Sequence, residues 1–124
     1  MGFSNQTALI THYYLSILER DPDPDGLAFW EGLAADRQAR GEDVKPVFRW
    51  MAEFFFFSQE YLGRHTTDRQ FITNLYLTFF QRAPDEGGYA WWLDQLARGM
   101  TRHHAMNGFL YSQEFTDFME ELGF

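Results

Sequence analysis

Residues 10–30 read ITHYYLSILERDPDPDGLAFW, and residues 72–92 read ITNLYLTFFQRAPDEGGYAWW. The two stretches align without a gap at an offset of 62 residues, and ten of their 21 positions are identical. An internal repeat of this kind must be found first, because each copy is expected to form the same supersecondary unit. The identical positions in the first copy are Ile10, Thr11, Tyr14, Leu15, Arg20, Pro22, Asp23, Gly26, Ala28 and Trp30.

A second block repeats further along the chain. Residues 57–61 read FSQEY and residues 111–115 read YSQEF, at an offset of 54 residues. The first copy therefore carries eight more residues than the second, and we place them between Ala35 and Pro46. The sequence predicts a tandem duplication within one compact domain, with a first unit at residues 1–66 and a second at residues 67–124.

Each unit is predicted to consist of four helices. In the first unit, helical spacing of apolar residues ends at a turn over residues 20–26, resumes up to Gly41, and starts again near Val44. Ser58 is expected to cap a short fourth helix. In the second unit, Thr67 with Gln70 forms a capping-box pattern, and two further caps are expected at Thr101 and Ser112. No segment shows the two-residue alternation of a half-buried strand, so the fold class is all-α.

Composition narrows the classes of partner. The 18 acidic and 10 basic side chains give a formal net charge of −8, which repels phosphate backbones and anionic lipid heads. No nucleic-acid partner is therefore expected. No apolar run is long enough to span a bilayer, no signal-peptide pattern opens the chain, and the absence of cysteine excludes thiolate metal sites.

The two repeated blocks together resemble a bacterial family known as domain of unknown function 4214. Its pattern is a helix that ends in a Gly-Arg-like step, then Asp-Pro-Asp-x-x-Gly-Leu-x-Tyr-Trp, and later a Phe-x-x-Ser-x-Glu-Phe segment. The first unit matches it with Arg20, Asp21, Pro22, Asp23, Gly26, Leu27, Trp30, Phe55, Ser58, Glu60 and Tyr61. The second matches it with Arg82, Pro84, Asp85, Gly88, Tyr89, Trp92, Phe109, Ser112, Glu114 and Phe115, and departs from it at Ala83.

The resemblance implies an architecture and a location more than an activity. Such domains look like accessory modules of secreted or surface-attached bacterial proteins, often in tandem and beside calcium-binding repeats. An extracellular or cell-surface location is therefore the expectation, although the composition alone is equally compatible with a cytoplasmic one.

The turn over residues 21–26 suggests a cation site. Asp21, Asp23 and Asp25 with Gly26 imitate the first half of a calcium-binding loop, because calcium prefers several hard oxygen ligands. The bidentate Glu that should close the loop is replaced by Gly32. The competing interpretation, which we favour, is a tight interhelical turn in which Asp23 or Asp25 caps the next helix. No cofactor is therefore expected, and calcium is the alternative.

The run Phe54-Phe55-Phe56-Phe57 cannot face one core, because successive helical residues are about 100° apart. Phe54 and Phe55 fall on the apolar stripe with Phe48 and Met51. Phe56 falls on the opposite face, where it is expected to contact the second unit or to form an exposed patch for a partner.

Trp91 offers a second aromatic candidate. It lies beside the core position Trp92, with Asp94 and Gln95 one helical turn away. An exposed indole can stack on a sugar ring while neighbouring carboxylate and amide groups bind the hydroxyls, although most aromatics at helical spacing belong to the core. Trp91, Phe56, Asp94 and Gln95 are thus the candidate ligand-binding residues.

No catalytic pattern emerges from the residue spacing. His103 and His104 are adjacent and point to different faces of a helix, and no phosphate loop or nucleophile motif is present. The expectation is a non-enzymatic binding or adhesion module of a bacterial surface or exported system, with glycan as the candidate ligand. The alternatives are an assembly or scaffolding module that binds another protein or a second copy of the chain, and a calcium-dependent module.

Overall fold

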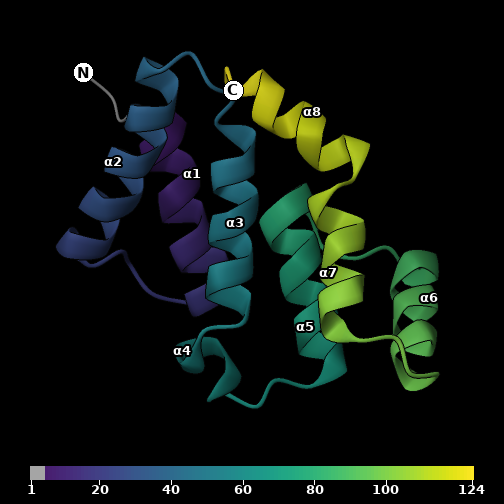
Figure 1. The fold of residues 1–124 in the computed structure, drawn as a ribbon. Coiled ribbons are helices and arrows are strands. Elements are labelled where there is room, and N and C mark those ends of the chain that lie inside the picture. The colour runs from purple at the N-terminus through teal and green to yellow at the C-terminus, as the bar shows by residue number, and fades with distance from the viewer. Residues whose placement is uncertain (1–4) are drawn as a thin grey trace. The chain divides into compact units, whose positions relative to one another are not determined.

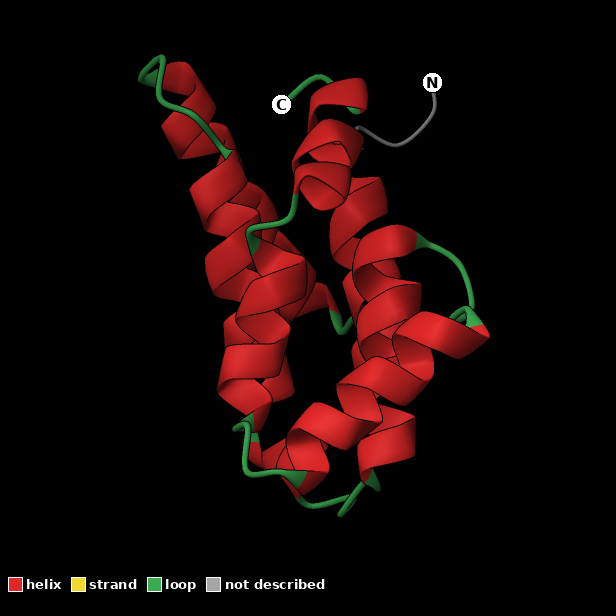
Figure 2. Cartoon of the chain, turned by 90° about the vertical axis from the view of Figure 1, so that its right-hand side faces the viewer, coloured by secondary structure: helices red, strands yellow, loops and turns green. Residues whose placement is uncertain are grey.

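The computed structural model describes residues 5–124, and all regular structure in that range is helical (Figures 1 and 2). This confirms the predicted all-α class. The elements are α1 (Asn5–Tyr13), η1 (Tyr14–Leu18), α2 (Pro24–Ala39), α3 (Lys45–Phe56), α4 (Gln59–Leu62), α5 (Asp68–Leu75), η2 (Tyr76–Phe80), α6 (Glu86–Ala97), α7 (Arg102–Leu110) and α8 (Gln113–Glu121), where η denotes a π-helical segment. Between residues 5 and 124, no helix combines the length and apolarity needed to cross a membrane.

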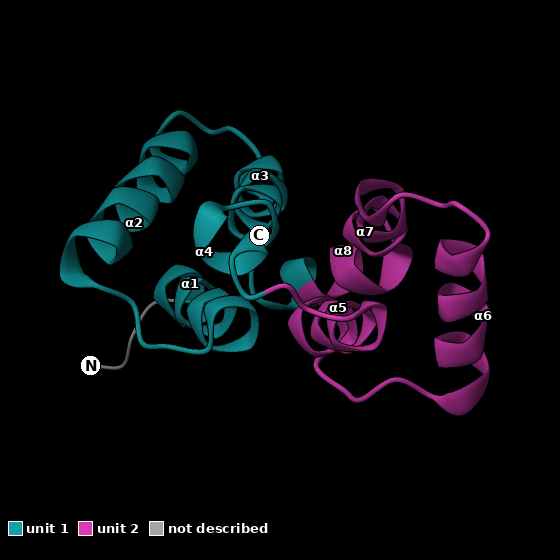
Figure 3. Cartoon of the chain, turned by 90° about the horizontal axis from the view of Figure 1, so that it is seen from below, with its two compact units in different colours: residues 1–64, 119–124 teal, residues 65–118 magenta. Residues whose placement is uncertain are grey.

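Contacts divide the chain into two units, which Figure 3 colours separately. The first unit holds the residues up to 64 together with residues 119–124, and the second holds residues 65–118. The sequence repeat assigns residues 119–124 to the second unit, whereas their contacts group them with the first. The reason is local: Phe124 stacks on Phe48 with ring centroids 4.9 Å apart, and the Lys45 Nζ donates to the Phe124 carbonyl at 3.1 Å.

Side-chain caps start most of the helices. The Ser58 and Thr101 hydroxyls accept the backbone N–H groups of Tyr61 and His104, as predicted. Thr67 and Gln70 form the predicted reciprocal capping box, and the Ser112 hydroxyl accepts the N–H of Phe115 at 3.2 Å. Each cap satisfies a backbone donor that would otherwise lack a partner at a helix start.

The first and fifth helices end in π-helical turns that the sequence analysis did not predict. Helix α1 continues directly into η1, and α5 continues directly into η2, so each of these helices ends in a wider, π-helical turn. The following residues, Glu19 and Gln81, adopt left-handed conformations with φ of 55° and 52°. These two features stop both helices at equivalent repeat positions and place the next residue, Arg20 or Arg82, at the start of the interhelical turn.

The buried face of α3 corrects the prediction for its phenylalanine run. Val47, Phe48, Met51 and Phe55 are buried as expected, but Phe54 is 55% exposed and Phe56 is only 1% exposed. The buried face of α3 includes Ala52 and Phe56 rather than Phe54. The Phe56 ring packs edge-on against the Tyr61 ring, with ring centroids 5.2 Å apart. The prediction that Phe54 lies in the core was therefore wrong, and so was the exposed interpretation of Phe56.

The eight additional residues of the first unit are mostly helical. α2 has 16 residues where α6 has 12, and α3 has 12 where α7 has nine. The surplus thus adds one turn to the end of α2 and most of a turn to the start of α3. The remaining residue lengthens the loop between them.

Gly26 provides a test of how closely the first unit is packed. A methyl group at Gly26 would collide with the Tyr14 hydroxyl and lie 3.0 Å from both carboxylate oxygens of Asp23. We expect Gly26→Ala to lower the free energy of unfolding by about 1–3 kcal/mol, as overpacking does. Urea denaturation followed by circular dichroism measures the change.

Gly32, on the same helix, is the matched control. A methyl group there meets no atom within 4 Å, so Gly32→Ala should raise the free energy of unfolding by about 0.5–1 kcal/mol through helix propensity alone. Combining Gly26→Ala with Tyr14→Phe should restore part of the loss, because the clashing oxygen is removed. An equal effect of the two glycine substitutions would contradict the close approach.

Candidate functional site

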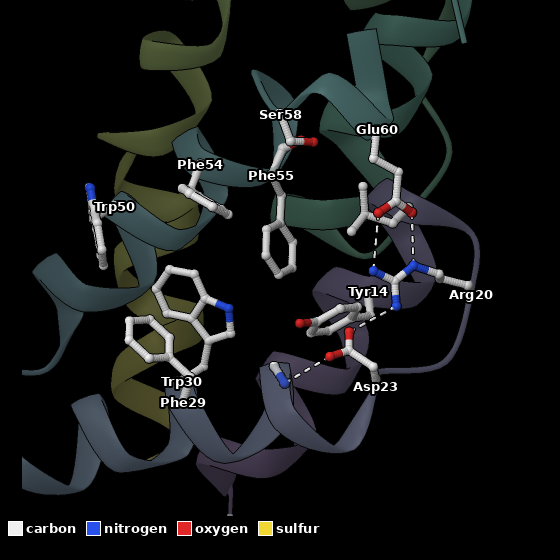
Figure 4. Close-up of a pocket in the computed structure, with 12 residues that line it drawn as sticks. Tyr14, Arg20, Asp23, Phe29, Trp30, Trp50, Phe54, Phe55, Ser58 and Glu60 are labelled. Atoms are coloured by element: carbon white, nitrogen blue, oxygen red, sulfur yellow. Dashed lines mark hydrogen bonds and ion pairs between the residues drawn. The ribbon is translucent and has the colours of Figure 1, made fainter. Parts of the chain in front are cut away.

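An arginine joins three elements of the first unit (Figure 4). Arg20 follows η1, and its Nε and Nη2 donate to the two carboxylate oxygens of Glu60 in α4 at 2.8 and 3.0 Å. Its Nη1 donates to Asp23, at the start of α2, at 3.1 Å. The guanidinium also lies over the Tyr14 ring, 5.0 Å from the centroid. We call Arg20, Asp23, Glu60 and Tyr14 the arginine junction.

The junction perturbs the ionisation of its members. Hydrogen bonds from Arg20 hold the pKa of Glu60 below its usual value. The backbone N–H of Gly26, followed by Arg20, lowers the pKa of Asp23. Burial, followed by the charge of Asp23, raises the pKa of Tyr14, and the charge of Arg20 partly offsets this. Both carboxylates are therefore charged near neutral pH, and each is engaged within the protein.

The second unit repeats this arrangement at equivalent positions. Arg82 contacts Glu114 at 3.2 Å and Asp85 at 3.5 Å, and it lies over the Tyr76 ring at 5.4 Å. Asp85 caps α6 through the N–H of Gly88, as Asp23 caps α2. The repeated polar residues thus serve the same structural purpose in both units, and they explain why the family pattern contains Arg, Asp, Gly and Glu.

The capping interpretation also accounts for the acidic turn. The Asp23 carboxylate accepts the Gly26 N–H at 2.8 Å and pairs with Arg20. Among residues 5–124, no group of three or more His, Asp or Glu side chains is arranged to hold a metal ion. The structure thus does not bring Asp21, Asp23 and Asp25 together as a ligand set.

An aromatic cavity of about 310 Å³ opens beside the arginine junction. The four residues of the arginine junction form part of its lining, and α2 and α3 supply the aromatic part. Trp30 is buried at the centre, and Phe29, Trp50 and Phe54 surround it with ring centroids 5.0, 5.1 and 5.6 Å away. Phe29, Trp50 and Phe54 are 57%, 48% and 55% exposed. Figure 4 shows these rings on one side of Tyr14 and the charged groups on the other.

A second cavity of about 650 Å³ adjoins the first. Phe29 and Trp50 line both cavities. The other lining residues of the second cavity are Leu33, Arg37, Glu42, Asp43, Pro46 and Val47. The first unit therefore presents an apolar surface between α2 and α3 with charged groups at its edges.

The second unit differs at the positions that form this surface. At the offset of 54 residues, Trp50 corresponds to His104 and Phe54 corresponds to Gly108. A methyl group on Gly108 would lie 2.7 Å from the Trp92 ring, so the indole occupies the space that the Phe54 side chain takes in the first unit. The polar junction and the aromatic residues at positions 29 and 30 are therefore common to both units, whereas Trp50 and Phe54 belong to the first alone.

The structure places the other predicted site residues separately. Trp91 on α6 is 52% exposed and packs edge-on against Trp92. Asp94 is engaged by Arg98 at 2.8 Å, and Gln95 is half-buried. Burial excludes Phe56 from direct contact with a ligand. Trp91 thus stays an accessible candidate, with Gln95 one turn away on the same helix.

Sequence reasoning missed Phe29, Trp50 and Phe54 as a cluster. Their convergence depends on how α2 packs against α3, which no local pattern reports. One signal was available: within the repeat, Trp50 and Phe54 stand where the second unit has His104 and Gly108, while the buried positions 51, 52, 55 and 56 stay apolar in both units. A substitution pattern of this kind marks a surface that differs between otherwise equivalent units.

Calcium provides a test of the acidic turn. Because Asp23 already caps α2 and pairs with Arg20, we expect millimolar calcium to leave the thermal midpoint of the protein unchanged. A ligand that binds only the folded state would raise that midpoint. Differential scanning calorimetry with and without calcium measures this, and a calcium-induced rise that disappears in Asp21→Ala would restore the predicted cation site.

The pH dependence of stability tests the junction. Asp23 and Glu60 have folded-state pKa values below their ordinary values of 3.8 and 4.5. Their stabilising contribution is therefore complete above those ordinary values and is lost as the pH falls through the lower, folded-state values. Between about pH 5 and pH 3, the wild type should lose more free energy of unfolding than Glu60→Gln, in which one of the two groups no longer titrates. Equal losses in urea titrations of the two proteins would contradict the shift assigned to Glu60.

Comparison with protein families gives one match. The model of the family described as "Domain of unknown function (DUF4214)" matches residues 52–119, which is more than half of the chain. The match starts within α3 and ends within α8, so it includes the block at residues 72–92 and the Phe-x-x-Ser-x-Glu segments of both units. A second complete copy remains a prediction from the internal repeat. No curated protein and no solved structure matches the chain.

Proposed function

The chain belongs to the DUF4214 family, whose description assigns no activity, and we propose that it is a non-enzymatic module that binds a glycan in the aromatic cavity of its first unit. The resemblance of its repeated blocks to the pattern of this family favours a bacterial surface or exported system as its setting. The observation that carries the proposal is the cluster of Phe29, Trp50 and Phe54 around Trp30, three partly exposed rings on one surface.

Exposed aromatic rings of this kind favour a ligand with apolar faces. Leaving large rings in water forgoes stabilisation of about 25 cal/mol for each Å² of apolar surface that stays exposed. A cluster of such rings on one surface is therefore typical of binding sites. A pyranose ring presents a face of C–H groups that can lie on an indole or phenyl ring, while its hydroxyls remain at the polar edge of the cavity.

The charges at the cavity favour a neutral ligand. Arg20 is satisfied by Glu60 and Asp23, so the junction offers no unpaired cation for an acidic sugar. The net charge of −8 repels anions further. The uncharged polar side chains of the lining, Tyr14 and Ser58, carry hydroxyl groups, which are compatible with a neutral ligand.

An assembly module is the second candidate. Leu15 and Leu77 occupy the same repeat position, and both are exposed. Leu15 also lines a separate cavity of about 470 Å³ with Thr7, Ala8, Thr11, His12, Pro22 and Leu27. Apolar exposure at both equivalent positions favours a protein partner or a second copy of the chain. Light scattering distinguishes these: a concentration-dependent mass that Leu15→Glu abolishes would support self-association.

Substitution of Trp50 tests the glycan proposal. Truncation of a central aromatic anchor typically costs about 2 kcal/mol or more of binding free energy, so Trp50→Ala should weaken glycan binding at least about tenfold. Screening of neutral cell-wall glycans on an array, followed by calorimetry with the ones that bind, measures the loss.

Trp91→Ala is the matched control, because Trp91 is a tryptophan of similar exposure in the second unit. It should leave the affinity within about twofold of the wild type, a difference too small to represent a lost anchor. If Trp91→Ala weakens binding and Trp50→Ala does not, the ligand lies on α6, as the sequence analysis suggested. If no neutral glycan binds, the proposed function is wrong.

A further inference from the structure

We infer that the glycan is a neutral chain of at least two sugar residues, and that the extra turns of α2 and α3 hold its second sugar. This inference rests on the proposed glycan-binding function and specifies the length and charge of the ligand. Its starting point is that the aromatic cavity is not isolated: Phe29 and Trp50 separate it from the larger cavity and line both.

Because the Phe29 and Trp50 rings line both cavities, a single extended ligand can occupy the two cavities together. Phe29 projects from α2 and Trp50 from α3, and each is about half exposed. A sugar ring stacked on Trp50 would therefore have the first cavity on one side and the second cavity on the other. Each cavity, at about 310 and 650 Å³, falls in or near the size range of a small-molecule site by itself. A single sugar would leave one of them unoccupied, whereas a chain would fill both.

The second cavity is built by the residues that distinguish the first unit from its repeat. Arg37 lies in the additional turn of α2, Glu42 and Asp43 lie in the longer loop, and Pro46 lies in the additional turn of α3. These residues fall at or next to the stretch where the eight extra residues were placed from the sequence. The surplus therefore supplies half of the lining of the second cavity.

The polar groups of the second cavity fit neutral hydroxyls. Arg37 is held by one long ion pair to Glu42, 3.5 Å between Nη1 and the carboxylate, and its buried Nε has no hydrogen-bond partner. A guanidinium held so loosely can reorient to donate to a hydroxyl, whereas the firmly paired Arg20 cannot. Glu42 pairs with Arg37 and Asp43 pairs with Lys45, so the charges at this cavity are balanced and no unpaired cation favours an acidic sugar.

The experiment measures affinity against chain length. Calorimetry would use cello-oligosaccharides and chito-oligosaccharides of increasing length, from one sugar upward, with polygalacturonate as the anionic probe. For the wild type, we expect affinity to rise at least about tenfold from one sugar to two or three and then to level off, as a second set of contacts is added and completed. Polygalacturonate should bind more weakly than the neutral chains.

Variants of the second cavity should remove the gain from chain length. Arg37→Ala and Glu42→Ala should reduce the rise to about threefold or less and leave binding of the single sugar unchanged. Arg40→Ala is the matched control, because Arg40 pairs with Asp36 at the same end of α2 and lines neither cavity. If circular dichroism shows that Arg37→Ala folds poorly, Leu33→Gln is a second variant of the same cavity. It introduces the residue that the second unit carries at the equivalent position, Gln95.

The outcomes separate this inference from the proposed function. Affinity that depends on Trp50 but not on chain length would overturn the two-sugar ligand and leave glycan binding intact. Tighter binding of polygalacturonate than of any neutral chain would overturn the assigned charge. If no neutral probe binds at any length, both the inference and the proposed function are wrong.

Discussion

A guanidinium held between two carboxylates organises each unit of this protein. Arg20 reaches Glu60, forty residues away along the chain, with a bidentate pair, and it reaches Asp23 with its remaining nitrogen. The planar fork of arginine accepts only a narrow range of geometries. The end of η1, the start of α2 and the start of α4 are therefore positioned together. Exposed ion pairs contribute only about 0.2–1 kcal/mol each to the free energy of unfolding. The buried aromatic core therefore supplies most of the stability, and the junction fixes how the ends of η1, α2 and α4 are arranged.

The same constraint explains what the duplication has kept and what it has changed. Arg82, Asp85 and Glu114 reproduce the junction in the second unit, and a glycine approaches a tyrosine hydroxyl in both units. Side chains outside the junction are under no such geometric requirement. Trp50 and Phe54 could therefore diverge from His104 and Gly108 without disturbing the helices that carry them. A rigid repeated frame with one variable surface is a suitable basis for a binding module.

The proposed binding surface follows from helix length as much as from residue type. The aromatic cluster around Trp30 lies where α2 and α3 run beside each other, and the additional turns extend that surface past Trp50. In the second unit, the shorter α6 and the Trp92 ring over Gly108 produce a different surface. The proposed specificity for an extended neutral chain thus depends on the eight residues by which the first unit exceeds the second.

The sequence by itself determined the features that act within one or two helical turns. It predicted the all-α class and the caps at Ser58, Thr67, Thr101 and Ser112, because apolar spacing and capping chemistry are local. It did not predict the π-helical ends, the exposure of Phe54 or the burial of Phe56. Only the tertiary structure decided these, and only it brought Arg20 to Glu60 and Trp50 to Trp30. Those contacts join segments that are far apart in the sequence, and their geometry depends on how whole helices pack, which no short pattern of residues encodes.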